Sequence, residues 1–379
     1  MKVELKEVLS KSDLRKFIEF PLELYKDCPY FVPPFYKDEF ETFLPRKNPA
    51  FEFCSVKQWL AFNGKNVVGR IAGIINHKFN ELWRQKAIRF GWIDFIDNEN
   101  VSKILIEKVA QWGRKNKLEY IHGPLGFSDM DYEGMLVEGF EEEGTLATIY
   151  NYSYYPVHLE RLDFEKEVDW VEFEIKVPTE IPERAERIAK IVSEKLNLKI
   201  LEAKSRKELL PYANDLFSTL NAAYKNLFGF VPLTEKQIKK YIKQYLSFVL
   251  PDYVKLVLDS EDKVAGFVIG LPSLSEALKK TGGKLFPFGF LEIMRALGKK
   301  NKKIDLYVGA IRPDLQGRGA DALLMVELTK SCIKNKVISA ETNIELETNT
   351  LVQGHWKYFD SRQHKRRRCF KKSLKDFLN

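Results

Sequence analysis

The stretch Ile304 to Leu328, IDLYVGAIRPDLQGRGADALLMVEL, decides the fold, because a strand-like run passes through a glycine-rich loop into a helix-forming run. The strand-like residues end before Pro313, and the loop is Gln316-Gly317-Arg318-Gly319-Ala320. Backbone N–H groups at the start of a helix bind anions, and small residues let phosphate oxygens approach them closely. Arg318 adds a mobile cation. The segment therefore predicts a phosphate-binding loop.

Two common phosphate-binding motifs do not fit this loop. No Gly-Lys-Ser/Thr follows it, as a Walker A loop requires, and the dinucleotide pattern G-x-G-x-x-G is not completed. The loop instead resembles the acyl-CoA pyrophosphate loop of the GNAT acyltransferase superfamily, Q/R-x-x-G-x-G/A, with Gln316 and Gly319 at matching positions. Asp321 departs from the Gly or Ala that the family has there, so a carboxylate would sit near the pyrophosphate.

This resemblance implies that acyl-CoA or acetyl-CoA is the donor substrate. In GNAT-like enzymes the strand before the loop splays from its neighbour, so that a backbone N–H meets the thioester carbonyl. Here that N–H would lie near Val308, Gly309 or Ala310. The donor-binding residues that the resemblance implies are Val308, Gly309, Ala310, Ile311, Gln316, Gly317, Arg318, Gly319, Ala320 and Asn349.

Transfer of an acyl group to an amine requires an acceptor that has lost a proton. A lysine-like amine, with a pKa of about 10.4, is largely protonated at neutral pH, and a carboxylate can take its proton. Glu345 and Glu347 are the candidate bases, and solvated strand-end charges are the alternative reading. The family often has an acidic Tyr seven residues after an Asn. Trp356 stands seven residues after Asn349, so Tyr358 is the candidate acid, with core packing as its alternative.

The length of 379 residues suggests about two domains. An order of helices, hairpin, strand, helix and strand recurs on both sides of residues 178 to 182. We expect an α/β fold (α+β, mixed sheet) of two tandem GNAT-like units, residues 1–178 and 179–379, each a central mixed β-sheet flanked by helices. In the first unit, Asp97 to Asn100 lead straight into a helix without a glycine, so we expect no acyl-CoA there. The chain as a whole resembles bacterial tandem GNAT-like proteins of poorly defined substrate.

An insertion at residues 273–303 is the second informative segment, because GNAT units cross this interval with a short turn. It contains LFPFGFLEIMRAL and then a lysine-rich run, with Phe290, Ile293, Met294 and Leu297 on one helical face. The helix either packs on the other domain, lines a long acyl chain, or rests on a membrane surface. Some GNAT-like bacterial proteins of this kind are thought to acylate sphingoid bases, so a lipid amine acceptor and a ceramide-synthase-like activity are implied options.

The amino-acid composition narrows the range of expected binding partners. The net charge of +8 and pI near 9.0 favour anionic partners such as CoA, acyl carrier protein or lipid headgroups. The terminal run HKRRRCFKK lacks a nucleic-acid motif, so nucleic acid is not favoured. The four cysteines are far apart and the acidic stretch Ser128 to Gly134 lacks a complete calcium pattern, so no metal is expected. We expect a cytoplasmic protein, with contact at the inner face of the membrane left open. A catalytically degenerate binding protein and a peripheral membrane or nucleic-acid module remain the alternatives.

Overall fold

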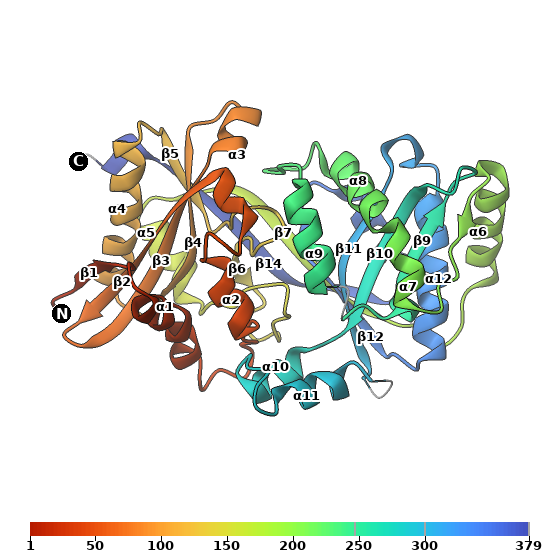
Figure 1. Ribbon diagram of the computed structural model, residues 1–379, viewed down its shortest axis with the longest axis horizontal. Coiled ribbons are helices and arrows are strands. Elements are labelled where there is room, and N and C mark those ends of the chain that lie inside the picture. The colour runs from red at the N-terminus through yellow and green to blue at the C-terminus, as the bar shows by residue number, and fades with distance from the viewer. Residues whose placement is uncertain (246–247, 299–300, 378–379) are drawn as a thin grey trace. The chain divides into compact units, whose positions relative to one another are not determined.

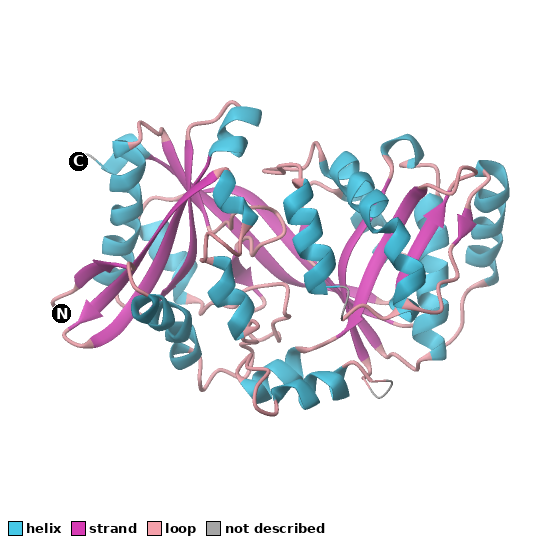
Figure 2. Cartoon of the chain, viewed as in Figure 1, coloured by secondary structure: helices cyan, strands magenta, loops and turns pink. Residues whose placement is uncertain are grey.

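The computed structural model describes residues 1–245, 248–298 and 301–377. The chain divides into two compact units, the first comprising Met1–Val171, Ser275–Ile293 and His364–Asn379, and the second Glu172–Leu274 and Met294–Gln363. Each unit is a mixed β-sheet flanked by helices (Figures 1 and 2), which confirms the expected fold class. The units gather segments that are distant in sequence, and a division into consecutive repeats at residue 178 stays a prediction.

The first unit contains most of the N-terminal elements. These are β1 (Glu4–Glu7), α1 (Lys11–Leu24), α2 (Tyr36–Thr42), β2 (Cys54–Asn63), β3 (Asn66–Asn76), α3 (His77–Leu82), β4 (Ala87–Phe95), α4 (Glu99–Lys115), β5 (Tyr120–Gly123), β6 (Met135–Glu138), α5 (Tyr154–Arg161), the start of β7 (Glu165–Lys176), α10 (Ser275–Thr281), most of α11 (Gly289–Ala296) and most of β14 (Ser361–Ser373).

The second unit begins within β7 and contains the predicted phosphate loop. Its further elements are α6 (Glu183–Leu196), β8 (Lys199–Ile200), α7 (Arg206–Leu209), α8 (Ala213–Tyr224), α9 (Glu235–Tyr245), β9 (Val254–Leu258), β10 (Val264–Pro272), β11 (Lys303–Ile311), α12 (Ala320–Lys334), β12 (Ser339–Thr342), β13 (Glu345–Leu346) and α13 (Thr350–Trp356).

One strand pattern is repeated in the two units. In the first, the order is β1-β2-β3-β4-β5-β14-β7, and in the second it is β7-β12-β11-β10-β9-β8. In each unit antiparallel strands lead to a parallel pair, β4 with β5 and β11 with β12, joined by a crossover helix, α4 or α12. The recurrence that the sequence indicated is thus present in the folded chain.

Alternating residues of the first sheet feed two cores on its opposite faces. Ile71 and Ile75 of β3 pack in one cluster with residues of α4, whereas Ala72 and Ile74 pack in the other with residues of α1. The helices present matching apolar stripes, which include Leu105 and Val109 of α4 and Leu14, Phe17 and Ile18 of α1. In the second unit α12 packs on α6, β9 and β10, while α8 contacts β10 and β11.

One helical segment of the second unit is interrupted. Residues 206–224 form α7, a 3-10 turn and α8 in place of one helix, because Pro211 lacks the N–H that a continuous helix needs. Helix α9 is described to Tyr245, and residues 246–247 lie outside the described residues, as do Lys299 and Lys300 of the insertion. In the described parts of the chain, no helix is both long and apolar enough to cross a bilayer.

Candidate functional site

The predicted phosphate loop connects β11 to α12 and is anchored at its start by Arg312. The Arg312 guanidinium contacts Asp259 Oδ2 at 2.6 Å and Asp314 Oδ1 at 2.7 Å. Gly317 and Gly319 then adopt left-handed backbone conformations, with φ of +69° and +89°. Glycine takes up such conformations without steric cost. The two glycines therefore turn the chain sharply into α12.

The N-terminus of α12 has the properties of an anion site. Gly319 is its N-cap and, having no side chain, forms no capping hydrogen bond. Such a helix start leaves backbone N–H groups without intrahelical partners at the positive end of the helix. Gln316, Gly317 and Arg318 are exposed, and a Cβ placed on Gly317 would meet nothing within 4 Å. The residues present thus fit the pyrophosphate of CoA, with Arg318 as a nearby cation.

Asp321, the residue that departs from the family pattern, is paired with a histidine. Its carboxylate contacts Nε2 of His355, which lies on α13. This hydrogen bond lowers the pKa of Asp321 below its ordinary value. The carboxylate is therefore held both by His355 of α13 and by the backbone N–H groups of Asp321 and Ala322, in the first turn of α12.

β11 separates from its parallel neighbour β12 after Leu306. The ladder between β11 and β12 ends at the pair Leu306 and Thr342, whereas β11 continues along β10 to Ile311. Residues Val308 to Ala310 thus have no partner on β12 in the described ladder. The hydroxyl of Tyr224, from α8, donates a hydrogen bond of 2.9 Å to the carbonyl of Gly309. Sequence reasoning missed Tyr224, because no motif marks it and it lies 85 residues away.

Glu345 lies at β13, largely buried, and is held by an indole. Trp356 Nε1 donates to both of its carboxylate oxygens, at 2.9 and 3.1 Å. Burial raises the pKa of Glu345 to about 8, and the Trp356 hydrogen bond acts in the opposite direction. A carboxyl group with such a pKa exchanges a proton near physiological pH, which suits a general base or acid. Trp356, which replaces the family's Tyr, therefore has a contact of its own with the candidate base.

The other predicted residues lie in less constrained places. Glu347 follows β13 and is half-buried, and Asn349 is the N-cap of α13, without a capping hydrogen bond from its side chain. Tyr358 follows α13 and is 87% exposed. The alternative of core packing for Tyr358 is therefore wrong. Among the described residues, none forms a hydrogen bond with its hydroxyl, and its role as acid stays a prediction.

In the first unit, the position equivalent to the phosphate loop is occupied by carboxylates. Asp97 pairs with His158 at 3.0 Å, and Glu99, in the first turn of α4, pairs with Arg161. The turn between β4 and α4 contains no glycine. Negative side chains at a helix start repel anions electrostatically. The expectation that this unit does not bind acyl-CoA stays a prediction.

The first unit does contain a cavity, which lies beside β4. Its walls are mainly apolar, and Glu39, Arg70 and Asp94 contribute charged groups. Arg70 Nε donates to Asp94 Oδ2 at 2.7 Å, and Trp92 Nε1 donates to Glu39 Oε2 at 2.9 Å. Burial raises the pKa of Glu39 to about 7. The volume of the cavity, about 50 Å³, is far below the ~300–1,000 Å³ of ligand pockets, so the cavity has room for water molecules and not for a substrate.

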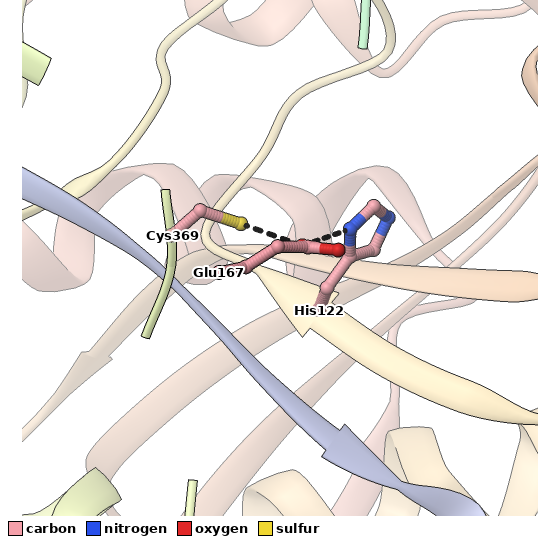
Figure 3. A group of neighbouring side chains, drawn as sticks. All are labelled: His122, Glu167 and Cys369. Carbon is pink, nitrogen blue, oxygen red and sulfur yellow. Dashed lines mark hydrogen bonds and ion pairs between the residues drawn. The ribbon is translucent and has the colours of Figure 1, made fainter. Parts of the chain in front are cut away.

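A buried group of His122, Glu167 and Cys369 joins β5, β7 and β14 of the first unit (Figure 3). Glu167 Oε2 lies 2.8 Å from His122 Nδ1 and accepts a weak bond from the Cys369 thiol at 3.5 Å. Lys371 Nζ lies 3.2 Å from the other oxygen. Burial raises the pKa of the Cys369 thiol well above its ordinary value. Glu167 thus connects three strands through its contacts with His122, Cys369 and Lys371.

Comparisons with known proteins agree with this architecture. No protein-family model matches the chain. It is 26% identical over 377 residues to Protein YghO of Escherichia coli (strain K12), covering 97% of this chain and 94% of that protein. It is 25% identical over 303 residues to the Bacterial ceramide synthase of Caulobacter vibrioides (strain NA1000 / CB15N), covering 78% of this chain and 77% of that protein.

Solved structures show the same fold. A tandem GNAT protein from the clavulanic acid biosynthesis pathway matches with a TM-score of 0.55 at 10% identity, over 98% of this chain and 99% of that chain. A GCN5-related N-acetyltransferase from Sphaerobacter thermophilus matches with a TM-score of 0.51 at 10% identity, over 98% and 96% of the two chains. The likeness extends along both units. The protein therefore has the tandem GNAT fold.

Proposed function

We propose that this protein is an N-acyltransferase that moves an acyl group from acyl-CoA to an amine acceptor. The observation that carries the proposal is the loop of the second unit. Two left-handed glycines lead into the start of α12, where Gly319 is the N-cap, directly after a strand that has left its parallel neighbour. The N–H groups of this helix start would hold the pyrophosphate of CoA, and Arg318 would add charge.

The thioester would lie along the free edge of β11. A backbone N–H near Val308 to Ala310 would donate to the thioester carbonyl and stabilise the oxyanion that forms when the amine attacks. Tyr224 supports the proposal, since its hydroxyl already contacts the carbonyl of Gly309. We assign it the role of acid for the departing thiolate, in preference to the exposed Tyr358.

Glu345 would remove the proton from the acceptor amine, directly or through a water molecule. Its burial and its bond from Trp356 fix the carboxyl group in position. Glu347, two residues on, is the second candidate for this role. In either case the base takes a proton from the ammonium group before the nitrogen attacks the thioester carbon, and the thiolate of CoA leaves.

A finer version of the proposal gives the acceptor as a lipid amine and the donor as a long-chain acyl-CoA. Two observations support it, the 25% identity to the Bacterial ceramide synthase and the apolar insertion that contains α11. Acyl carrier protein is an alternative donor, since the positive net charge suits its acidic surface. We place the reaction in the cytoplasm, where thiols such as the four free cysteines stay reduced. A lipid acceptor would also require contact with a membrane surface.

A binding protein without turnover is the second candidate function. The observation that favours it is Trp356, an indole at the position where the family often has an acidic Tyr. In that case Glu345 and Trp356 would form a structural pair, and CoA would bind without reacting.

Release of CoA thiol separates these functions. Acetyl-CoA and palmitoyl-CoA would each be offered with a small diamine, a lysine peptide and a long-chain amino alcohol, and products identified by mass spectrometry. We expect the wild type to form an amide. Arg318→Ala should lower the rate of amide formation at least about tenfold, and Lys334→Ala, at the far end of α12, should leave it unchanged. CoA binding without an amide product from any pair would instead support the binding protein.

A further inference from the structure

A cluster of exposed apolar side chains projects from the insertion. Its members, which we call the apolar patch, are Phe286, Phe288, Phe290, Leu291 and Met294, with exposed fractions of 80%, 73%, 44%, 43% and 64%. The rings of Phe286 and Phe290 lie against each other, with centroids 6.4 Å apart. Apolar residues on soluble proteins are usually exposed singly, so a cluster within nine residues marks an interaction surface.

The patch is held outward by a well-packed base in the first unit. Ser275, at the start of α10, donates to the carbonyl of Gly144 at 3.0 Å, and Lys279 pairs with Glu143. The carbonyl of Gly283 accepts the N–H of Tyr36 at 3.0 Å. A Cβ on Gly283 would come within 1.9 Å of a backbone oxygen, so only glycine fits this contact. The segment is thus anchored on both its helix and its turn.

The helix α11 turns its two sides to different environments. Ile293 is 3% exposed, while Phe290, Leu291 and Met294 of the same helix face outward. The sequence predicted one shared apolar face for Phe290, Ile293, Met294 and Leu297, but only Ile293 and Leu297 are buried. Ile293 and Leu297 thus bury the inner face of this segment, and Phe290, Leu291 and Met294 are available to a binding partner.

Charge around the patch identifies the partner. Lys280 and Lys284, in the same unit as the patch, and Arg295, on helix α11 itself, are exposed. Residues 273–303 carry eight Lys and Arg against two Glu, a net charge of +6 within a chain of +8. Exposed Phe side chains next to basic residues are typical of proteins that bind the interface of a lipid bilayer. Each Lys near an anionic membrane surface strengthens binding by about fivefold.

We infer that the apolar patch inserts into the surface of an anionic lipid bilayer, with the surrounding lysines on its headgroups. The protein would then bind a membrane peripherally. This inference goes beyond the proposed function and does not depend on it, because it stands on the exposure, anchoring and charge of this segment. If the acyl transfer proposal fails, the membrane contact is still expected.

Flotation with lipid vesicles tests the inference. The full chain would be mixed with vesicles of phosphatidylcholine and phosphatidylglycerol at 3:1, and with phosphatidylcholine alone. We expect the wild type to bind the anionic vesicles. The double substitution Phe286→Ser with Phe288→Ser should weaken this binding at least about tenfold. Lys280→Glu with Lys284→Glu should weaken it similarly. Two control variants should bind as well as the wild type. Ile338→Ser with Leu351→Ser also removes two exposed apolar side chains, and Lys11→Glu with Lys16→Glu reverses two exposed charges elsewhere.

Several outcomes would overturn the inference. The first is that the wild-type protein does not float with anionic vesicles, or floats equally with phosphatidylcholine alone. The second is that the patch variants, shown to be folded by circular dichroism, float as well as the wild type. The third is that light scattering shows a wild-type dimer and that Phe286→Ser with Phe288→Ser converts it to a monomer. A second copy of the chain, and not a membrane, would then cover the patch.

Discussion

Asp321 is the residue at which this chain departs most clearly from the phosphate loop that it resembles. Because its carboxylate pairs with His355, we expect that Asp321→Asn changes CoA affinity by less than about threefold. A carboxylate that repelled the pyrophosphate would behave differently, and its removal would raise the affinity by about tenfold or more. Titration calorimetry with free CoA, on both proteins at one salt concentration, distinguishes the two cases.

Glu345 gives the proposed reaction a defined pH dependence. Its folded-state pKa of about 8 lies above the ordinary 4.5, so the basic form accumulates only as pH rises through about 8. We expect kcat/KM to rise through that region and Glu345→Gln to abolish the rise. Trp356→Phe removes a donor that favours the charged form, so the profile should move to higher pH. A profile unchanged by both substitutions would contradict the assignment.

The same pKa shift also affects stability. Between pH 4.5 and 8 the unfolded chain loses the Glu345 proton and the folded protein keeps it, so stability falls as pH rises through this window. Glu345→Gln should therefore gain stability relative to wild type at pH 8.5 and not at pH 4. Urea unfolding at both pH values measures this difference, which a fully solvated Glu345 would not produce.

The loop residues could be predicted from sequence, but their partners could not. Gln316 to Ala320 form a local pattern, since the glycines and the helix they precede are adjacent in the chain. Tyr224 and His355 reach this region by tertiary packing, and nothing near them in sequence signals it. The exposure of Tyr358 could not be predicted either. Its spacing after Asn349 predicts the direction of its side chain only if the helix continues to residue 358, whereas α13 ends at Trp356.

At the scale of elements, one buried ion pair ties β3 to β4. Arg70 and Asp94 stand directly opposite in the ladder, and both are less than a tenth exposed. Tyr25 also donates to Asp94, at 2.9 Å. Removing one partner of such a pair leaves a buried charge without compensation, which costs about 3–5 kcal/mol.

We therefore expect Arg70→Ala to lower the free energy of unfolding by about 3–5 kcal/mol. Lys57→Ala, which breaks the more exposed pair of Lys57 with Glu7 between β2 and β1, should cost less than about 1 kcal/mol. Chemical denaturation of the two variants measures the difference. Equal losses would mean that the Arg70 pair adds nothing beyond a surface contact.

Strands and long helices of this chain follow from local periodicity, and this is why most of them could be predicted. β11 and α12 lie where the pattern of residues 304–328 predicts a strand and a helix. The short strands β1, β6 and β13 could not be predicted, because two to four residues carry too little pattern and their existence depends on pairing with distant strands.

At the scale of the whole molecule, the C-terminal strand belongs to the first unit. β14 lies between β5 and β7, as Figure 1 shows in blue, and Phe370 pairs with Gly123. Lys365 and Arg367 of the basic run are each 1% exposed, and Arg368 pairs with Asp169 at 2.9 Å. The run is thus a structural strand, which removes the main support for nucleic-acid binding. Pairing across 247 residues could not be predicted from sequence.

A chain that ends at Asp360 should fail to fold its first unit, because the sheet would lose a strand from its interior. Hydrogen exchange should then show β3, β4 and β5 unprotected. Arg362→Ala with Gln363→Ala, two exposed positions at the start of β14, should leave their protection intact. Normal protection in the truncated chain would mean that β14 is dispensable.

The measurement that tests the central claim most directly is stabilisation by CoA of the wild type, Gly319→Glu and Gly64→Glu. Both glycines are left-handed, with φ of +89° and +61°, so the two substitutions carry the same added charge and similar backbone strain. A Cβ on Gly319 would also press on Val192 at 3.0 Å, whereas Gly64 lies in the open hairpin turn between β2 and β3. At 100 times its dissociation constant, CoA should stabilise the wild type and Gly64→Glu by about 2.7 kcal/mol, and Gly319→Glu not at all. Equal stabilisation of all three proteins, or of none, would contradict a donor site at this loop.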